Sequence, residues 1–367
     1  MRRILGRQQV AISASATALA LVVMAPGAMH AEPSAPVGSV PVGAQKVMDK
    51  EAYATARWLY EVADLKTGEV LLANRPHELV FTGSTAKNFT IASAYAILGP
   101  DSRTTTPVYS TSPVQDGVVN GNLVLVASGD LTLGGRGAMQ GQVDQSFTAT
   151  AIDHVYGDIA PNAVLPPGDP LAGLDSLAAQ VASKGVTQVQ GDVLIDDRLW
   201  QTQTSHEGPV PPIFVNDNLL DLTVTPAAVG ATASVTARPS TSAYGVQSNV
   251  MTQAGSDVKL TVTADPADPQ LLLVSGTIGA DAGPRLTIYR VPDPASWART
   301  LFIEALGRAG VTVAAEADRP NATANLPAPG TYDSQLELAA LTSPPLSATG
   351  TMILETSYNT GANTVLC

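Results

Sequence analysis

The sequence predicts an α+β fold in which two helical parts are separated by a long, mostly β region. Apolar residues at helical spacing run over residues 84–98 and again over residues 293–310, and a glycine closes each pattern. Between them, residues 104–289 hold short apolar runs separated by turns rich in Gly, Pro, Ser and Thr. We therefore expect one or two mostly β domains to be inserted between the helical parts.

The first 31 residues have the layout of a cleaved secretion signal. Three arginines lie within the first seven residues, an uncharged apolar run covers residues 10–24, and a stretch of small residues ends at Ala31. The apolar run is too short for a stable membrane span. We expect cleavage after Ala28 or Ala31, no stable membrane span after cleavage, and export to the periplasm, the extracellular space or the cell wall.

Composition and charge exclude several classes of function. A chain of 367 residues with 45% hydrophobic residues can bury two or three cores. Removal of residues 1–31 takes away three arginines and no acid, so the net charge of −12 becomes −15. That charge argues against nucleic acid or an anionic membrane as a partner. Because Cys367 is the only cysteine, no intrachain disulfide can form.

We expect no metal and no cofactor. The four histidines, His30, His77, His154 and His206, are scattered, and neither H-E-x-x-H nor G-x-x-x-x-G-K occurs. A Ser-His-Asp triad stays open, although no G-x-S-x-G elbow supports one.

Residues 32–100 are predicted to start with a flexible leader and to end in the first helical part. In chain order we expect a leader over 33–43, a helix over 46–57, a strand over 58–63, a turn over 64–69, a strand over 70–73 and a helix over 84–98. Gly68 supplies the positive φ angle that the turn needs.

The start of the helix over 84–98 carries a candidate nucleophile. Ser84 and Lys87 are three residues apart, so they lie on one helix face and can share a pocket. A serine hydroxyl is a weak nucleophile near neutral pH, and a partly buried, neutral lysine within hydrogen-bond reach can act as its base. The alternative is a serine that caps the helix and a solvated lysine.

The region over residues 101–290 is predicted to be mostly β. We expect strands within 123–127, 188–195, 233–237, 260–264 and 271–275, and a helix over 174–184. Asp196 and Asp197 follow a strand and suggest a metal pair, but we interpret them as a solvated turn.

A helical sequence pattern returns in the last part of the chain. Asp293 can cap a helix whose first position is Pro294. Residues 343–346, Ser-Pro-Pro-Leu, then introduce a final segment that contains Ser357-Tyr358-Asn359, an S-x-N pattern.

These motifs together resemble the class C low-molecular-mass penicillin-binding proteins, the D-alanyl-D-alanine carboxypeptidase/endopeptidase family S13. The resemblance covers residues from about 56 to the end and rests on S-x-x-K before S-x-N. The gap between the two motifs is far longer than in class A β-lactamases. Further matching stretches are 64–68, 128–133, 191–197, 216–218, 293–294 and 343–346.

The resemblance implies a penicillin-binding/β-lactamase-like transpeptidase domain with an antiparallel sheet and flanking helices, split by an insertion. Ser84 would attack the penultimate D-alanine, and Lys87 would accept the serine proton. Ser357 would relay a proton towards the leaving group, and Asn359 would bind the substrate amide and orient Lys87. Peptidoglycan stem peptides would be the substrates, in carboxypeptidase or endopeptidase action, and β-lactam antibiotics the inhibitors.

One part of the family's pattern is absent. No K-T-G follows Asn359, and the K-T-G at residues 66–68 precedes the nucleophile and lies in the predicted turn. In the family, the strand with this motif supplies the second oxyanion donor and holds the substrate carboxylate. We therefore expect an incomplete, truncated catalytic domain with impaired activity, formed by residues 32–100 and 291–367 around an insertion over 101–290.

Two other functions stay open. An exported serine β-lactamase or esterase is one, although the long gap between Lys87 and Ser357 opposes it. A non-catalytic envelope protein that binds cell-wall polymer through its inserted domains is the other, and the absent motif favours it.

Overall fold

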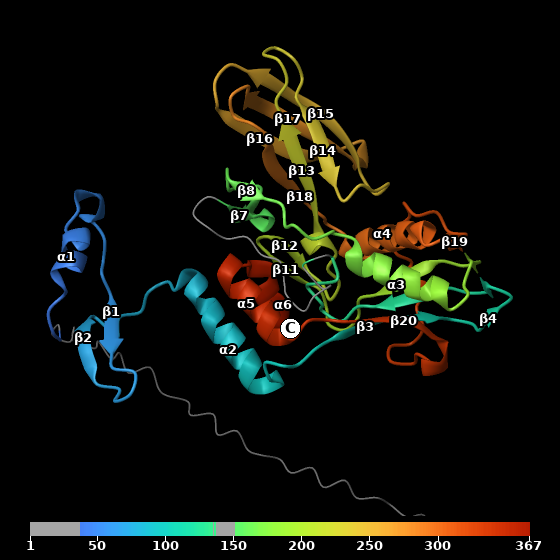
Figure 1. Cartoon of the computed structure of the whole chain (residues 1–367), viewed down its shortest axis with the longest axis horizontal. Coiled ribbons are helices and arrows are strands. Elements are labelled where there is room, and N and C mark those ends of the chain that lie inside the picture. Colours follow the sequence, from blue (N-terminus) through green and yellow to red (C-terminus); the bar gives the residue numbers. More distant parts are fainter. Residues whose placement is uncertain (1–36, 135, 137–150) are drawn as a thin grey trace, which may run out of the picture. The chain divides into compact units, whose positions relative to one another are not determined.

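The computed structural model of the chain describes residues 37–134, 136 and 151–367 (Figure 1). The predicted secretion signal over residues 1–31 lies outside these residues. Contacts divide the chain between Phe81 and Thr82 into two compact units, which are described separately below. Within the described residues, no helix combines the length and the apolar character that crossing a membrane requires.

The first unit consists of a short helix and a β-hairpin. Its elements are α1 (Val42–Met48), a 3₁₀ turn (Glu51–Tyr53), β1 (Tyr60–Ala63) and β2 (Val70–Asn74). The helix predicted over residues 46–57 is wrong in extent, because the chain becomes extended at Lys50, with ψ at 139°. The predicted turn is confirmed: the Asp64 carboxylate accepts from the N–H groups of Lys66 and Thr67, and Gly68 has φ at 73°. The K-T-G at residues 66–68 therefore forms a hairpin turn.

The second unit contains three helices that pack together, α2 (Ala86–Leu98), α5 (Leu346–Thr356) and α6 (Asn359–Leu366) (Figure 1). The predicted helix over 84–98 is confirmed, with a 3₁₀ turn at Gly83–Thr85 before it and Gly99, at φ 86°, after it. Gly350 allows α5 to approach α2 closely, because a Cβ atom there would overlap the Tyr95 hydroxyl.

A four-stranded sheet forms another part of the second unit. Its strand order is β10-β6-β3-β20, in which β10 and β6 are parallel and the other pairs antiparallel. The strands are β3 (Thr105–Ser110), β6 (Leu123–Val126), β10 (Val193–Asp196) and β20 (Glu337–Thr342). Because β20 pairs with β3, the sheet joins strands from both sides of residue 290. The expected domain division at 290/291 stays a prediction.

Two helices cover this sheet, α3 (Ala172–Ser183) and α4 (Pro294–Arg308). They pack against each other, α3 against β20 and α4 against β10. Both helices are predicted from the sequence and confirmed, and the Asp293 carboxylate caps α4 by accepting from the Ser296 N–H at 3.1 Å. Trp297, Leu301 and Phe302 of α4 are almost fully buried in the core beneath.

Two three-stranded sheets make up the remaining β part. The first has the order β14-β13-β18, and the second has the order β15-β17-β16. Their strands are β13 (Leu219–Thr225), β14 (Ser234–Arg238), β15 (Gly245–Gln253), β16 (Val258–Asp265), β17 (Asp268–Gly279) and β18 (Arg285–Arg290). The strands predicted within 233–237, 260–264 and 271–275 are therefore confirmed.

The other strands are short. They are β4 (Val114–Gln115), β5 (Val118–Val119), β7 (Ile152–Asp153), β8 (Ala163–Val164), β9 (Gln188–Val189), β11 (Gln203–Ser205), β12 (Gly208–Val210) and β19 (Thr312–Val313). The single strand predicted over 188–195 is wrong, since the chain turns between β9 and β10 at Gly191. A Cβ atom at Gly191 would lie 2.6 Å from the Gly121 carbonyl oxygen, so only glycine fits this close approach.

Asp196 contradicts the interpretation of residues 196–197 as a solvated turn. It is 5% exposed, and its carboxylate accepts hydrogen bonds from the Arg198 guanidinium and the Tyr332 hydroxyl. Burial alone would raise the pKa of Asp196, but these donors outweigh burial and lower it. The carboxylate therefore holds the neighbouring Arg198 and the distant Tyr332 in a largely buried place.

A small core connects the three helices with the β part and thereby positions the candidate site. Its buried members come from α2, α5, α6 and several β segments: Ile91, Leu131, Val155, Val210, Phe214, Leu219, Ile288, Met352, Ile353, Tyr358 and Ala362.

Candidate active site

The start of α2 presents Ser84 to solvent and Lys87 to the interior. Ser84 lies in the 3₁₀ turn that leads into α2, and the Thr85 hydroxyl fixes this turn by donating to the Thr82 carbonyl at 2.6 Å. Lys87 is 7% exposed, and its Nζ donates to the Ser84 Oγ at 3.2 Å. The two residues therefore share a hydrogen bond, as their spacing predicts.

The S-x-N motif forms the turn between α5 and α6. Ser357 follows α5 in the left-handed region, with φ at 58° and ψ at 31°, and Asn359 is the first residue of α6. Tyr358 between them is 2% exposed, and its N–H donates to the Ile353 carbonyl at 3.0 Å. The Tyr358 side chain is buried in the small core, and Ser357 and Asn359 on either side of it are half-buried.

Asn359 brings the two motifs together. Its Oδ1 accepts a hydrogen bond from Lys87 Nζ, although 272 positions separate the two residues in the chain. Ser84, Lys87 and Asn359 thus form one connected group. The hydroxyl of Ser357 has no hydrogen bond among the described residues, while its carbonyl oxygen accepts from the Tyr156 hydroxyl at 2.5 Å.

Glu207 is part of this group and is not predicted from the sequence. It lies in the turn between β11 and β12, and its Oε1 accepts from Asn359 Nδ2 at 2.6 Å. Its Oε2 accepts from the Thr360 hydroxyl at 3.3 Å. No motif surrounds Glu207 in the sequence, so only the fold reveals it.

Burial and a nearby negative charge act in opposite directions on the pKa of Lys87. Burial lowers its pKa below the ordinary value for lysine, and the negative charge of Glu207 offsets part of this effect. A lysine with a lowered pKa, hydrogen-bonded to a serine hydroxyl, can accept the proton of that hydroxyl.

A second set of buried ionisable groups lies next to the Tyr358 ring. The guanidinium of Arg136 pairs with Asp153 and Asp217 at 2.7 Å each, and it lies 5.6 Å from the centre of the Tyr358 ring. His154 is hydrogen-bonded to Asp217 at 2.9 Å and to Asp221 at 2.7 Å.

The backbone around Asp217 is unusual, and it is built from Asn and Asp, the non-glycine residues that adopt this conformation most often. Residues 216–218 all have φ between 52° and 56°, a region that non-glycine residues seldom adopt. Side-chain hydrogen bonds hold this turn: Asn216 Nδ2 donates to the Leu219 carbonyl, and Asn218 Nδ2 donates to the Ile213 carbonyl. The turn presents Asp217 to Arg136 and His154.

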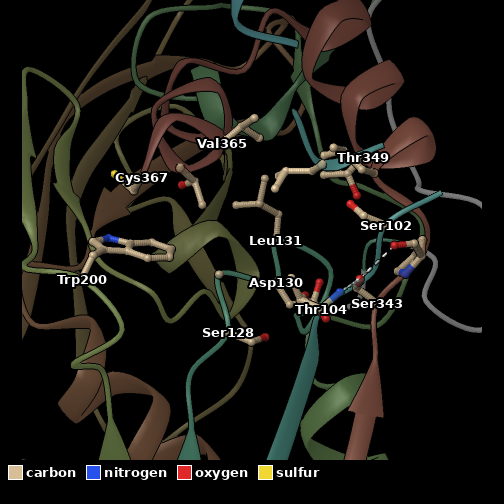
Figure 2. A pocket seen from close by; sticks show the side chains of 15 residues that line it. Ser102, Thr104, Ser128, Asp130, Leu131, Trp200, Ser343, Thr349, Val365 and Cys367 are labelled. Carbon is tan, nitrogen blue, oxygen red and sulfur yellow. Dashed lines mark hydrogen bonds between the residues drawn. The ribbon is translucent and has the colours of Figure 1, made fainter. Parts of the chain in front are cut away.

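A separate cavity of about 200 Å³ lies near the C-terminal end of α2 (Figure 2). Ser128, Asp130, Leu131, Trp200 and Val365 are among its lining residues, and none of the candidate catalytic residues lines it. Asp130 is 5% exposed, and its Oδ1 accepts from the Thr132 N–H and hydroxyl. Burial raises the pKa of the Asp130 carboxyl.

Among the described residues, no group of three or more histidine, cysteine, aspartate or glutamate side chains has the arrangement of a metal site.

Comparison with known proteins places these features in a family. The model of the D-Ala-D-Ala carboxypeptidase 3 (S13) family matches residues 44–367. A D-alanyl-D-alanine carboxypeptidase from Actinomadura sp. (strain R39) is 27% identical over 271 residues, which cover 69% of this chain and 44% of that protein. The chain therefore spans less than half the length of this curated relative.

Solved structures show the same fold. Penicillin binding protein 4 (dacB) from Haemophilus influenzae, in complex with a novel β-lactam, superposes with a TM-score of 0.55 and 16% identity. The match covers 83% of this chain and 58% of that one. Another structure of that protein gives a TM-score of 0.54 and 13% identity, over 83% and 65% of the two chains. The predicted α+β fold of the penicillin-binding type is thereby confirmed.

Proposed function

Because the chain belongs to the D-Ala-D-Ala carboxypeptidase 3 (S13) family, we propose that it acts on D-alanyl-D-alanine peptides with Ser84 as the nucleophile. The observation that carries this proposal is the position of Lys87, whose Nζ contacts both Ser84 Oγ and Asn359 Oδ1. An unrelated helix cap would not need a buried lysine that joins two motifs 272 positions apart.

The proposed acylation step uses the residues as follows. Lys87 accepts the Ser84 proton while Ser84 Oγ forms a bond to the carbonyl carbon of the penultimate D-alanine. The N–H of Ser84 lies just ahead of α2, where the helix dipole is positive, and stabilises the oxyanion that develops. The peptide bond then breaks: Ser357 gives its hydroxyl proton to the nitrogen of the leaving D-alanine and takes up the proton held by Lys87, which returns to its neutral form. Water releases the shortened peptide from Ser84 in a second step.

The same groups account for the proposed substrates and inhibitors. Asn359 holds the amide of a peptidoglycan stem peptide, and a β-lactam ring opens on Ser84 to leave a stable acyl-enzyme. Such substrates occur outside the cytoplasm, in agreement with the secretion signal that residues 1–31 suggest.

The acylation rate that we propose for residues 1–367 depends on K-T-G, the third motif of the family. Residues 360–367 hold no K-T-G, the motif that in the family supplies the second oxyanion donor and the carboxylate-binding groups. Loss of one oxyanion donor alone slows acyl transfer by about 10²–10³-fold. We propose slow acylation for residues 1–367 and faster acylation once a K-T-G-bearing segment follows Cys367.

Labelling with a fluorescent penicillin tests the proposal. The rate constant is measured for residues 1–367 alone and for the same residues fused to the C-terminal segment of the Actinomadura relative. Lys87→Ala should slow labelling by about 10²–10⁴-fold, since the hydroxyl loses its base. Lys66→Ala, in the hairpin K-T-G, is the matched control and should leave the rate unchanged. Equal effects of the two substitutions would refute the role of Lys87, and fast turnover of the antibiotic would indicate a β-lactamase instead.

A further inference from the structure

Glu207 reaches the candidate site from outside the two motifs. It lies in the turn between β11 and β12, where its N–H donates to the Ser205 hydroxyl at 3.1 Å. This short hairpin packs against α6. The Glu207 side chain is 11% exposed, so its carboxylate is largely withdrawn from water.

Both oxygens of this carboxylate are engaged at the start of α6. One accepts from Asn359 Nδ2 at 2.6 Å and the other from the Thr360 hydroxyl at 3.3 Å. An ionised carboxylate can only accept hydrogen bonds, so it requires the nitrogen of the Asn359 amide to face it. The amide oxygen must then point the opposite way, where it accepts from Lys87 Nζ.

We propose that Glu207 is a positioning residue, which fixes the orientation of the Asn359 amide and thereby holds Lys87 against Ser84. The proposal rests on the proposed function of Ser84 and Lys87. Without an acceptor at this place the amide could rotate, and its NH₂ group would then face the ammonium or amine of Lys87. In that orientation Lys87 loses its acceptor and its fixed distance to Ser84.

Glu207 also adds a negative charge near Lys87. Ser84 and Asn359, which accept hydrogen bonds from Lys87, are neutral, and the charge of Glu207 opposes the effect of burial on the lysine. The His206 imidazole lies 3.7 Å from the Glu207 carboxylate but is 82% exposed, so solvent screens its effect.

The experiment compares Glu207→Gln with Glu316→Gln, which removes the charge of an exposed glutamate that pairs with Arg319. The first readout is the ¹³C NMR titration of Lys87 in ¹³C-lysine-labelled protein, assigned by Lys87→Ala among the six lysines of the chain. Glu207→Gln should move the Lys87 midpoint to lower pH, because a negative charge is lost, and Glu316→Gln should leave it unchanged. This readout needs no turnover.

The second readout is the pH profile of penicillin acylation. The acidic limb should move to lower pH in Glu207→Gln, in parallel with the lysine titration, and the plateau rate should fall by about 10–100-fold because the amide is no longer held. Glu207→Asp, which keeps the charge, should keep the midpoint. A lower plateau with an unmoved Lys87 midpoint would overturn the proposal and leave only a structural role for Glu207.

Two further outcomes separate the competing explanations. Unchanged acylation with slower release of the penicilloyl group would overturn the positioning role and identify Glu207 as the base of the hydrolytic step. A shifted Lys87 titration in a protein that no penicillin labels would refute the proposed function while the positioning role of Glu207 stands.

Discussion

His154 should make the stability of the protein depend on pH between neutral and alkaline conditions. Its imidazole is fully buried, with Nδ1 2.7 Å from Asp221 and Nε2 2.9 Å from Asp217, and Asp153 lies 3.8 Å away. Burial alone would lower the pKa of His154. The carboxylates of Asp221 and Asp217 outweigh burial and raise the pKa from 6.5 to about 9.

The size of the effect follows from this rise. A tenfold change in proton affinity corresponds to about 1.4 kcal/mol, so the charged His154 adds about 3 kcal/mol to the free energy of unfolding. Because the folded protein binds the proton more tightly than the unfolded chain, the contribution is fully present below pH 6.5. It is lost as the pH rises through about 9.

Urea unfolding at pH 6, 7, 8, 9 and 10 measures this loss, with tryptophan fluorescence, to which Trp297 contributes, as the probe. Trp297 suits the measurement because its indole N–H donates to the Val215 carbonyl, two residues before Asp217. His154→Gln should remove most of the pH dependence, and His206→Gln, at an exposed histidine, should retain it. The same decline of the free energy of unfolding between pH 6 and 10 in wild type and His154→Gln would show that His154 does not cause it.

Three further predictions concern packing and surface. Gly350→Val should lower the free energy of unfolding by about 1–3 kcal/mol, since the valine side chain overlaps Tyr95. Urea unfolding measures this loss, and an unchanged value would show that α5 can move away from α2. Arg299→Ala should lower the free energy of unfolding by about 3–5 kcal/mol, because the buried guanidinium pairs with Asp192 at 2.5 Å. A loss below about 1 kcal/mol in urea unfolding would contradict the pairing. Ile97→Lys should change the free energy of unfolding by less than about 0.5 kcal/mol, because the Ile97 side chain is 80% exposed on α2; a larger loss in urea unfolding would show that Ile97 is packed in the folded protein.

The sequence predicts elements well where the signal is local. Helix α4 has its capping Asp293, its proline and its closing Gly310 within a single stretch, and the structure reproduces all three. The hairpin at Asp64–Gly68 is equally local. Ser357 and Asn359 are predicted from the order of the motifs and the family resemblance. Their distance from Ser84 in the sequence does not by itself predict that they lie close to Ser84 in the fold.

The missed features depend on contacts between distant segments. Glu207 meets Asn359 across 152 positions, and Asp196 is buried by Tyr332 across 136 positions. Nothing near either acid in the sequence distinguishes it from a solvated one. The contacts of the turn at residues 216–218 belong to the same class, because Asp217 meets Arg136 and His154 across 81 and 63 positions.

Peptide mass spectrometry after reaction with penicillin is the most direct test of Ser84 as the nucleophile. Folded protein, verified by circular dichroism, is incubated with benzylpenicillin with and without the K-T-G-bearing extension, then digested. We expect an adduct of one intact penicillin on the peptide that contains Ser84, formed faster with the extension and absent in Ser84→Ala. An adduct on another residue, an adduct that survives Ser84→Ala, or no adduct in either folded form would show that Ser84 is not the nucleophile.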